Sequence, residues 1–212
     1  MEFVLPSQAF VNRFVPKSKF FEKAIVNTKL KKEFTDSIQK ITWLYKLADE
    51  TIGIKGTSNV EEIQIFEIQL KEQMIPKNVL RVIDKTISYP ILYVFIHDTH
   101  FAYGITLKGD SSKNYYFSDW DSDISFNFSG ITLEKVYQGI ITQFIDGGEG
   151  RGSDFDTLVE TDKKRKLLET EISAMKNKIA NEKQFNRKVE LNKALQDKKK
   201  DLESIIKSHL PL

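Results

Sequence analysis

The sequence contains no cysteine, which excludes disulfides, thiolate zinc sites and cysteine nucleophiles. It also has no apolar run of the roughly 18 residues that a membrane-spanning helix requires. The first ten residues have neither the basic start nor the long apolar stretch of a signal peptide. We therefore expect a cytoplasmic protein with no membrane association.

An excess of charge of one sign is also missing, because 32 Lys and Arg residues nearly balance 30 Asp and Glu residues. The net charge of +2 gives no electrostatic reason to expect DNA binding, although DNA binding stays open. The sequence is well supplied with apolar residues, and 15 of them are Phe. A chain of 212 residues with this composition can form one well-filled domain and an appendage.

The segment from Val60 to Lys71 predicts the strand around which the sheet is built. Side chains alternate between the two faces of a strand. Both faces of this segment are apolar near its middle, with Ile63 and Ile65 on one face and Phe66 and Ile68 on the other. Because a strand of this kind is covered on both sides, we expect it to be central rather than at an edge.

Hydrophobic periodicity divides the rest of the first 146 residues into helices and strands. Apolar stripes and capping residues predict the helices, and runs of β-branched and aromatic residues predict the strands. Residues 1–16 are expected to be irregular. The expected helices cover residues 17–26, 28–39, 76–87 and 131–145. The expected strands cover residues 41–47, 51–54, 60–71, 115–120 and 124–128, and residues 91–108 are expected to form a two-stranded hairpin.

The hairpin prediction includes a register, which follows if Asp98 and Thr99 form a two-residue turn. The Asp-Thr pair is a weak turn signal, so a loop of four residues is the alternative. Residues that face each other across two strands share a face of the sheet. The two-residue turn pairs Ile96 with Phe101, Val94 with Tyr103, Leu92 with Ile105, Phe95 with Ala102 and Tyr93 with Gly104.

The sequence changes character after residue 146. The glycine-rich residues 147–153 predict a flexible linker, and residues 154–212 predict two long helices joined near residues 181–186. The fold class is therefore α+β: a mainly antiparallel sheet packed with helices over residues 1–146, followed by a helical hairpin. Apolar residues with coiled-coil spacing are Leu168, Ile172, Met175 and Ile179 in the first helix and, less regularly, Val189, Leu195, Leu202 and Ile206 in the second.

Three polar residues, Glu67, Gln69 and Lys71, follow one another on one face of the central strand. Nucleases of the restriction-endonuclease type carry an acid or a Gln two residues before a Lys on such a strand. In those sites carboxylates bind Mg²⁺, which activates water, and the lysine stabilises charge on the phosphate. The order of predicted elements over residues 28–96 also matches the core of these enzymes.

A nuclease site needs a second acid from an earlier element. Glu50 is the first candidate, with Asp49 and Glu61 as alternatives, but none is an unambiguous metal ligand. Short patterns of this kind also occur by chance, so the alternative is a strand whose polar end emerges into solvent. The catalytic hypothesis thus names Glu67, Gln69, Lys71 and Glu50 with Mg²⁺, whereas the alternative requires no cofactor.

A second candidate site lies at the predicted hairpin turn, where His97 and His100 face each other with Cβ atoms about 5 Å apart. Two imidazoles beside Asp98 could bind a divalent metal. A third ligand is not visible in the sequence. The alternative is an exposed loop tip, where polar residues are ordinary.

Two further patterns fail as binding motifs. Asp119, Asp121 and Asp123 resemble the start of a calcium loop, but the required glycine and glutamate do not follow. We therefore interpret them as turn residues. The glycine-rich residues 147–152 lack the Lys-Ser/Thr pair of a phosphate-binding loop.

Five segments carry a resemblance that covers nearly the whole chain in the same order. They are VPKSKFFEKA (15–24), ITWLYKLADETIGI (41–54), VEEIQIFEIQLKE (60–72), YPILYVF (89–95) and KQFNRKVELNKAL (183–195). Together they resemble a bacterial family catalogued only as domain of unknown function 4391. The family has no established activity, so the resemblance implies no catalytic residue.

The resemblance does imply a role in DNA restriction or phage defence, because members of the family occur beside helicases and DNA methyltransferases. The first hypothesis is therefore a non-enzymatic accessory module that binds such a larger partner, with a metal-dependent nuclease as the second. Self-association through the C-terminal helices is the alternative use of the hairpin, since a narrow apolar seam needs a partner.

Overall fold

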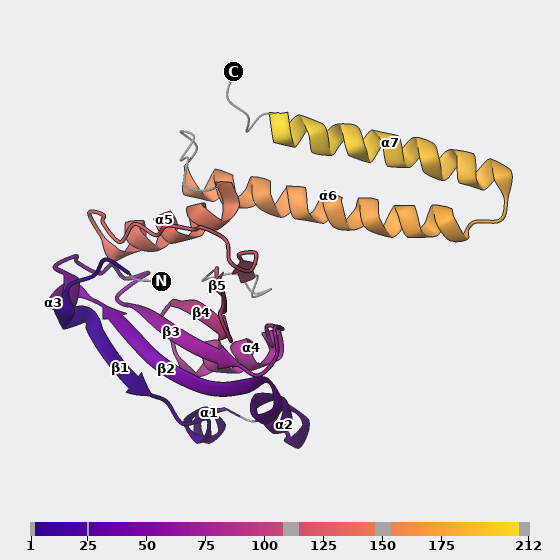
Figure 1. Ribbon diagram of the computed structural model, residues 1–212. Coiled ribbons are helices and arrows are strands. Elements are labelled where there is room, and N and C mark those ends of the chain that lie inside the picture. The colour runs from indigo at the N-terminus through magenta and orange to yellow at the C-terminus, as the bar shows by residue number, and fades with distance from the viewer. Residues whose placement is uncertain (1–2, 25, 108–114, 147–153, 208–212) are drawn as a thin grey trace. The chain divides into compact units, whose positions relative to one another are not determined.

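The computed structural model describes residues 3–24, 26–107, 115–146 and 154–207. The chain divides into two compact units, Met1–Gly148 and Glu149–Leu212 (Figure 1). The predicted linker over residues 147–153 lies outside the described residues.

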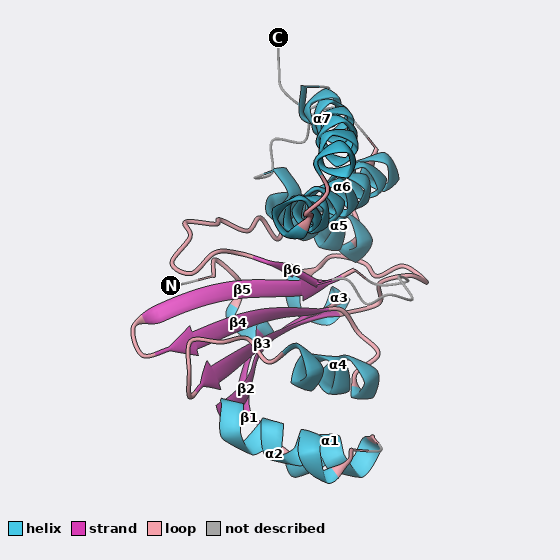
Figure 2. Cartoon of the chain, turned by 90° about the vertical axis from the view of Figure 1, so that its right-hand side faces the viewer, coloured by secondary structure: helices cyan, strands magenta, loops and turns pink. Residues whose placement is uncertain are grey.

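A six-stranded sheet, with its strands in sequence order, forms the centre of the first unit (Figure 2). Neighbouring strands are antiparallel except for β3 and β4, which are parallel and are joined by α4 (Lys77–Thr86). A parallel pair requires such a crossover. The α+β fold class is confirmed. The strands are β1 (Phe10–Phe14), β2 (Ile38–Leu47), β3 (Ile63–Leu70), β4 (Ile91–His97), β5 (His100–Thr106) and β6 (Tyr115–Phe117).

The central position predicted for the segment 60–71 is confirmed, although β3 is shorter than predicted. It pairs with β2 on one side and with β4 on the other. Its apolar residues are buried on both faces, including Ile65 on one and Phe66 on the other. Its polar residues toward the C-terminal end, Glu67 and Gln69, are only half-buried.

Helices α1 (Ser18–Lys23), α2 (Thr28–Ser37) and α4 cover one face of the sheet. The Asn27 side chain caps α2 by accepting from the backbone N–H of Leu30 at 2.9 Å, as an N-cap residue does. The core on this face contains Phe20, Phe34, Leu80 and Ile83 from the helices and Phe66, Ile68, Tyr93 and Phe95 from the strands.

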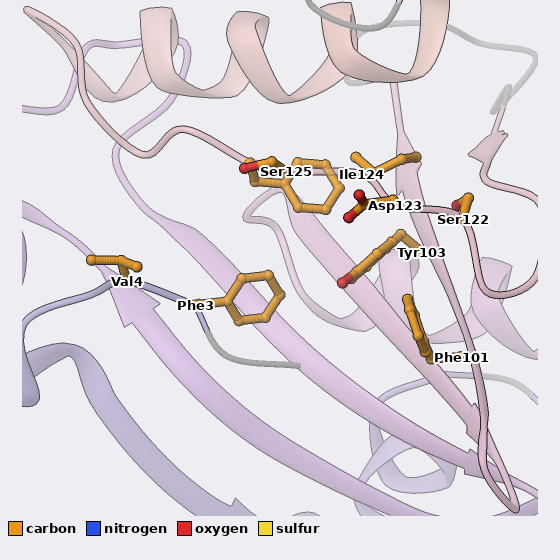
Figure 3. A pocket seen from close by; sticks show the side chains of 9 residues that line it. Phe3, Val4, Phe101, Tyr103, Ser122, Asp123, Ile124 and Ser125 are labelled. Carbon is orange, nitrogen blue, oxygen red and sulfur yellow. The ribbon is translucent and has the colours of Figure 1, made fainter.

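The opposite face is covered by α5 (Leu133–Asp146) and by the loop that precedes it (Figure 2). Phe126 of the loop packs edge-to-face on Tyr103 of β5, with ring centroids 4.9 Å apart, and also contacts Phe144 of α5. The hydroxyl of Tyr137 donates to the carbonyl of Thr106 at 2.7 Å, which ties α5 to the end of β5. A pocket lies between this loop and Phe3 (Figure 3).

The strand predicted over residues 51–54 is wrong, because α3 (Asp49–Ile52) forms in its place. The Thr51 hydroxyl accepts from the backbone N–H of Ala48 at 2.9 Å and donates to the carbonyl of Lys46 at 2.7 Å. Gly53 then ends the helix at φ 70°. Local hydrogen bonds of a threonine compete with strand formation in this way.

Two other predictions fail at the margins of the sheet. The predicted strand over residues 124–128 has no strand partner, although Ile124, Phe126 and Phe128 are half-buried and the residues between them are exposed. The alternation of apolar and polar residues therefore arises because one side of this loop packs on the protein, and not because the segment pairs with a strand. The lead-in predicted as irregular contains a short helix (Ser7–Ala9) and the edge strand β1.

The hairpin of β4 and β5 has the predicted register, from Leu92 opposite Ile105 to His97 opposite His100. Asp98 has φ 51°, a conformation that Asp tolerates better than most residues. The two-residue turn of Asp98 and Thr99 is therefore confirmed, and the four-residue alternative is excluded.

The second unit is a hairpin of two helices, α6 (Phe155–Asn181) and α7 (Phe185–Lys207). Ile172 and Leu195 are buried, and the Lys198 ammonium lies 2.5 Å from the Glu171 carboxylate across the pair. The predicted seam of the second helix is partly wrong, because Val189 is 51% exposed and Ile206 is 42% exposed. Leu191 and Ile205 are more covered.

Gly104 of β5 is a position where the packing requires glycine. A Cβ there would lie 2.8 Å from Cδ1 of Phe117 and 2.9 Å from Cε2 of Phe95. We expect Gly104→Ala to lower the free energy of unfolding by about 1–3 kcal/mol, as overpacking does. Gly139→Ala in α5 is the control, because a Cβ there would meet no other described atom within 4 Å apart from the backbone of its own helix. Urea denaturation should show that the control is neutral or stabilising, and equal stability of the two variants would contradict the packing argument.

Candidate functional site

Glu67 and Gln69 lie on the same face of β3, and Gln69 Nε2 donates to Glu67 Oε1 at 3.2 Å. Thr42 of β2 is directly opposite Glu67. The Thr42 hydroxyl is buried and has no hydrogen-bond partner, which is uncommon for a buried polar group. A carboxylate, an amide and an unpaired hydroxyl are therefore neighbours at this point of the sheet.

Lysines surround the same end of β3. Lys40 pairs with Gln69 across the strands and is exposed, and Lys71 is exposed directly after β3. The Lys17 ammonium donates to the carbonyl of Ile38 at 2.5 Å. Burial and, next, the nearby charge of Lys71 lower the pKa of Lys17. Three lysines, Lys17, Lys40 and Lys71, therefore lie near the C-terminal end of β3.

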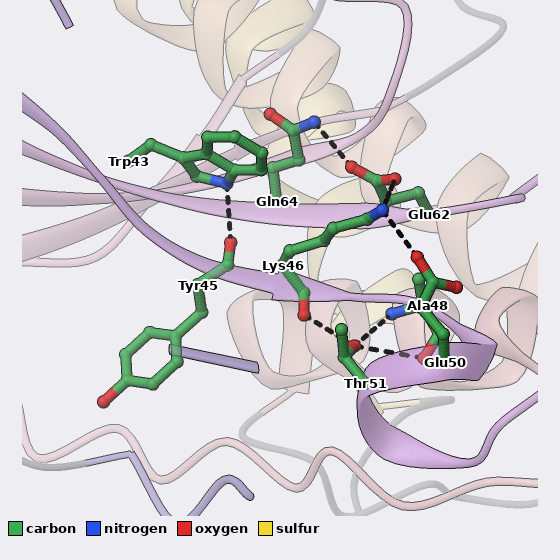
Figure 4. A network of polar contacts seen from close by, with 8 residues as sticks. All are labelled: Trp43, Tyr45, Lys46, Ala48, Glu50, Thr51, Glu62 and Gln64. Carbon is green, nitrogen blue, oxygen red and sulfur yellow. Dashed lines mark hydrogen bonds and ion pairs between the residues drawn. The ribbon is translucent and has the colours of Figure 1, made fainter. Parts of the chain in front are cut away.

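Glu50 is held at the other end of β3 (Figure 4). The Lys46 ammonium lies 2.6 Å from Glu50 Oε1 and 3.2 Å from Glu62 Oε2, and Gln64 Nε2 donates to Glu62 at 2.7 Å. The hydrogen bond with Lys46 lowers the pKa of Glu50. Lys46 pairs with Gln64, which is five residues before Gln69 and so on the order of 16 Å away along the strand.

The two alternative acids are also at the far end. Asp49 is exposed in the first turn of α3, and Glu61 is exposed just before β3. The structure therefore brings Glu67 and Gln69 together but does not bring Glu50, Asp49 or Glu61 to them. The nuclease hypothesis keeps one carboxylate at its site and remains a prediction.

His97 and His100 face each other across the hairpin as expected, but they bond in different directions. His100 Nδ1 lies 2.6 Å from Asp121 Oδ2, and His97 Nδ1 lies 3.4 Å from the carbonyl oxygen of Leu70. The contact with His100 lowers the pKa of Asp121. In the part of the chain that the structure describes, no three His, Cys, Asp or Glu residues gather in a metal-binding group. A metal at this histidine pair stays a prediction.

Comparison with known proteins identifies the family. Residues 3–202 match the sequence model of the family described as Domain of unknown function (DUF4391). The chain belongs to the DUF4391 family. No curated protein matches the chain, and no solved structure matches it. Within the described ranges, no helix of this DUF4391 protein has the length and apolarity to cross a membrane.

Asp84 is a polar centre of this DUF4391 fold that the sequence interpretation missed. The Tyr93 hydroxyl donates to Asp84 Oδ1 at 2.7 Å, and the Thr106 hydroxyl donates to Oδ2 at 2.9 Å. The Tyr115 hydroxyl also donates to Oδ2. A signal was present, because Asp84 lies four residues after Leu80 and so falls on the buried stripe of α4.

These bonds change the acidity of the tyrosines. Burial and, next, the charge of Asp84 raise the pKa values of Tyr93 and Tyr115 above the ordinary value of 10. The hydroxyls that donate to Asp84 offset the free-energy cost of placing a carboxylate among apolar neighbours. We infer that Asp84 joins α4 to β4, β5 and β6 as a positioning residue.

We expect the free energy of unfolding to fall as the pH rises above about 10, because tyrosines then ionise in the unfolded chain but keep their protons when folded. A tyrosine whose pKa is raised by folding contributes stability at pH values below its unfolded pKa, and this stability is lost as the pH rises toward the folded pKa. The loss should reach about 1.4 kcal/mol per pH unit for each tyrosine.

The measurement is chemical denaturation at about pH 8 and about pH 11, on either side of the tyrosine pKa, for the wild type and for Tyr93→Phe. The variant should lose less stability between the two pH values than the wild type does. The difference between the two proteins removes the contribution of other groups that titrate in this range. An identical loss would contradict the assignment to Tyr93.

Proposed function

We propose that this DUF4391 protein is a non-enzymatic adaptor that binds a larger partner protein through its helical hairpin. The single observation that carries the proposal is an apolar pair at the turn between the helices. Phe185 is 79% exposed and Val189 is 51% exposed. Residues four apart lie on the same face of a helix, so the two side chains form one small surface at the start of α7.

Because Phe185 and Val189 are exposed in the hairpin, a partner that covers them would gain the free energy of burying their side chains. Burying a Phe or Val side chain contributes roughly 1.5–3 kcal/mol. The seam within the hairpin uses other residues, among them Ile172 and Leu195. Large aromatic side chains that a partner covers are typical centres of binding energy.

The turn that presents Phe185 is held in place before any partner binds. Glu182 Oε1 accepts from the backbone N–H groups of Lys183 at 2.8 Å and Gln184 at 2.9 Å. These bonds lower the pKa of Glu182, with the bond from Gln184 the largest cause. A preorganised contact loses less conformational entropy on binding. Lys183 and Lys188 are neighbours of the apolar pair in the sequence, and Arg187 pairs with Glu182 at 3.5 Å, so a partner surface with acidic groups near the two lysines would fit best.

The resemblance of the sequence to a family found beside helicases and DNA methyltransferases supports the choice of partner. We therefore assign the adaptor to a DNA restriction or phage-defence system. Its place in such a system would be to hold the helicase or methyltransferase, without chemistry of its own.

The test uses the 212-residue chain and any helicase or DNA methyltransferase that is encoded beside its gene. We expect Phe185→Ser combined with Val189→Ser to weaken binding at least about a hundredfold, as loss of a central aromatic contact does. The control is Leu167→Ser combined with Ile206→Ser, two exposed apolar residues elsewhere on the hairpin. Isothermal titration calorimetry should show that the control binds like the wild type.

Unchanged binding by the Phe185 and Val189 variant would contradict the proposal. Sedimentation analysis of the protein alone tests the remaining alternative, which is self-association through the C-terminal helices. A wild-type dimer that the same double variant converts to a monomer would show that the pair serves self-association instead.

A second candidate function, a metal-dependent nuclease, is supported by the bond between Gln69 and Glu67 at the C-terminal end of β3, where lysines gather. Mg²⁺ binds oxygen ligands and often takes only one or two carboxylates, with substrate phosphates completing its shell. The Glu67 carboxylate and the Gln69 side-chain oxygen fit that requirement. Lys71 and Lys17 would bind the phosphate backbone. When bound, the metal would supply the activation of water.

Incubation of the protein with Mg²⁺ or Mn²⁺ and plasmid or single-stranded DNA tests this candidate. A nuclease should lose at least about a hundredfold in rate in Lys71→Ala, as a group that stabilises transition-state charge does, and should stop when the metal is chelated. Lys32→Ala, an exposed lysine on α2, is the control and should keep the activity. Cleavage that survives in Lys71→Ala would show that the activity does not come from this site.

A further inference from the structure

A pocket of about 310 Å³ lies within the first unit, between the N-terminal segment, β5 and the loop before α5 (Figure 3). Phe3 faces Tyr103 across it, and the Asp123 carboxylate lies next to Tyr103. Pockets for small ligands start at about 300 Å³, so this one would take a small molecule or the end of a long side chain.

Four of the nine lining residues are aromatic, namely Phe3, Phe101, Tyr103 and Phe126, and several of their rings stand at steep angles to one another. The ring planes of Tyr103 and Phe126 are inclined by 84°, those of Phe101 and Tyr103 by 68°, and those of Phe3 and Tyr103 by 52°. None of these pairs is a parallel slot into which a flat ring could stack. Inclined aromatic rings are instead the walls of cages that bind alkylated ammonium groups.

The charge of the lining is negative. Asp123 is the one charged residue among the nine lining residues, all of which the structure describes, and none of the nine is basic. Burial and, next, the charge of Asp123 raise the pKa of Tyr103, in keeping with the place of this carboxylate beside the tyrosine ring. A cation would be attracted both by this carboxylate and by the ring faces.

Ser122 provides a polar group that has no hydrogen-bond partner among the described residues. Its hydroxyl oxygen is buried and has no hydrogen-bond partner, and the residue lines the pocket. Buried hydroxyls are normally paired. A ligand with a hydroxyl or carbonyl group near its cationic end would satisfy it.

We propose that this pocket binds an alkylated ammonium group, with Asp123 balancing its charge and Phe3, Tyr103 and Phe126 contacting its methyl groups. The proposal is independent of the adaptor function, because it involves no residue of the helical hairpin. The same group occurs in free small molecules such as choline and in trimethylated lysine side chains of proteins. The two sources share the chemistry and are distinguished by experiment.

The test is isothermal titration calorimetry of the full-length protein with choline and with 3,3-dimethylbutan-1-ol, its neutral isostere. We expect choline to bind at least about tenfold more tightly, because the isostere has the same shape without the charge. A second pair of probes, a trimethyllysine peptide and its unmodified lysine form, shows whether the natural source is a protein side chain. Stronger binding of the trimethylated peptide than of choline would identify that source.

Asp123→Asn should weaken binding of the preferred cation about tenfold, because it removes the opposite charge and keeps the shape. Asp119→Asn is the matched control, since Asp119 is exposed in the same segment and does not line the pocket. Both side chains are exposed, and equal melting temperatures will confirm that both variants fold. Equal binding of choline and its isostere, absence of binding by both cationic probes, or unchanged affinity in Asp123→Asn would each overturn the proposal.

Discussion

The pairing of β3 on both of its sides determines how the first unit is built. Its antiparallel partner β2 comes before it in the chain, and its parallel partner β4 comes after it. A parallel partner cannot be reached by a tight turn, so α4 must cross one face of the sheet. That face then receives the apolar side of α4 together with α1 and α2, and the loop and α5 are left to cover the other face.

Three carboxylates in or near the sheet are stabilised by local donors, and the donors differ. Asp84 accepts from three hydroxyls. Glu62 accepts from the Gln64 amide and pairs with Lys46. Among the residues that the structure describes, Glu67 accepts a side-chain hydrogen bond only from the Gln69 amide, and it stands opposite the Thr42 hydroxyl, which has no partner there. The Glu67 site is thus the least satisfied of the three, which is why it keeps a functional interpretation.

The pocket beside Tyr103 depends on the irregular course of the chain after β6. A strand would use its backbone groups in a ladder along the sheet edge, whereas this loop lies over the face and places Phe126 on Tyr103. The same path buries the Ser122 hydroxyl without a partner and brings Asp123 to the aromatic walls. Surface loops on a rigid sheet are common positions for binding residues.

Local patterns in the sequence were enough to predict much of the fold. Alternation over the segment 60–71 predicted a central strand, and facing residues predicted the register of the β4–β5 hairpin, because both depend on neighbours in the chain. The same patterns failed at Thr51, where side-chain hydrogen bonds form a helical turn, and at residues 124–128, where an alternating segment has no strand to pair with.

The sequence by itself determined the composition of the core, the division into sheet and helical hairpin, and the presence of Glu67 and Gln69 on one face. Only the tertiary structure decided which polar groups from separate segments meet: Lys46 with Glu62, His100 with Asp121, and Asp84 with two tyrosines. The physical reason is distance along the chain. Side chains that are a few residues apart are positioned relative to one another by backbone geometry. Contacts between distant segments depend on how whole helices and strands pack, and the periodic pattern of residues within one segment does not specify that packing.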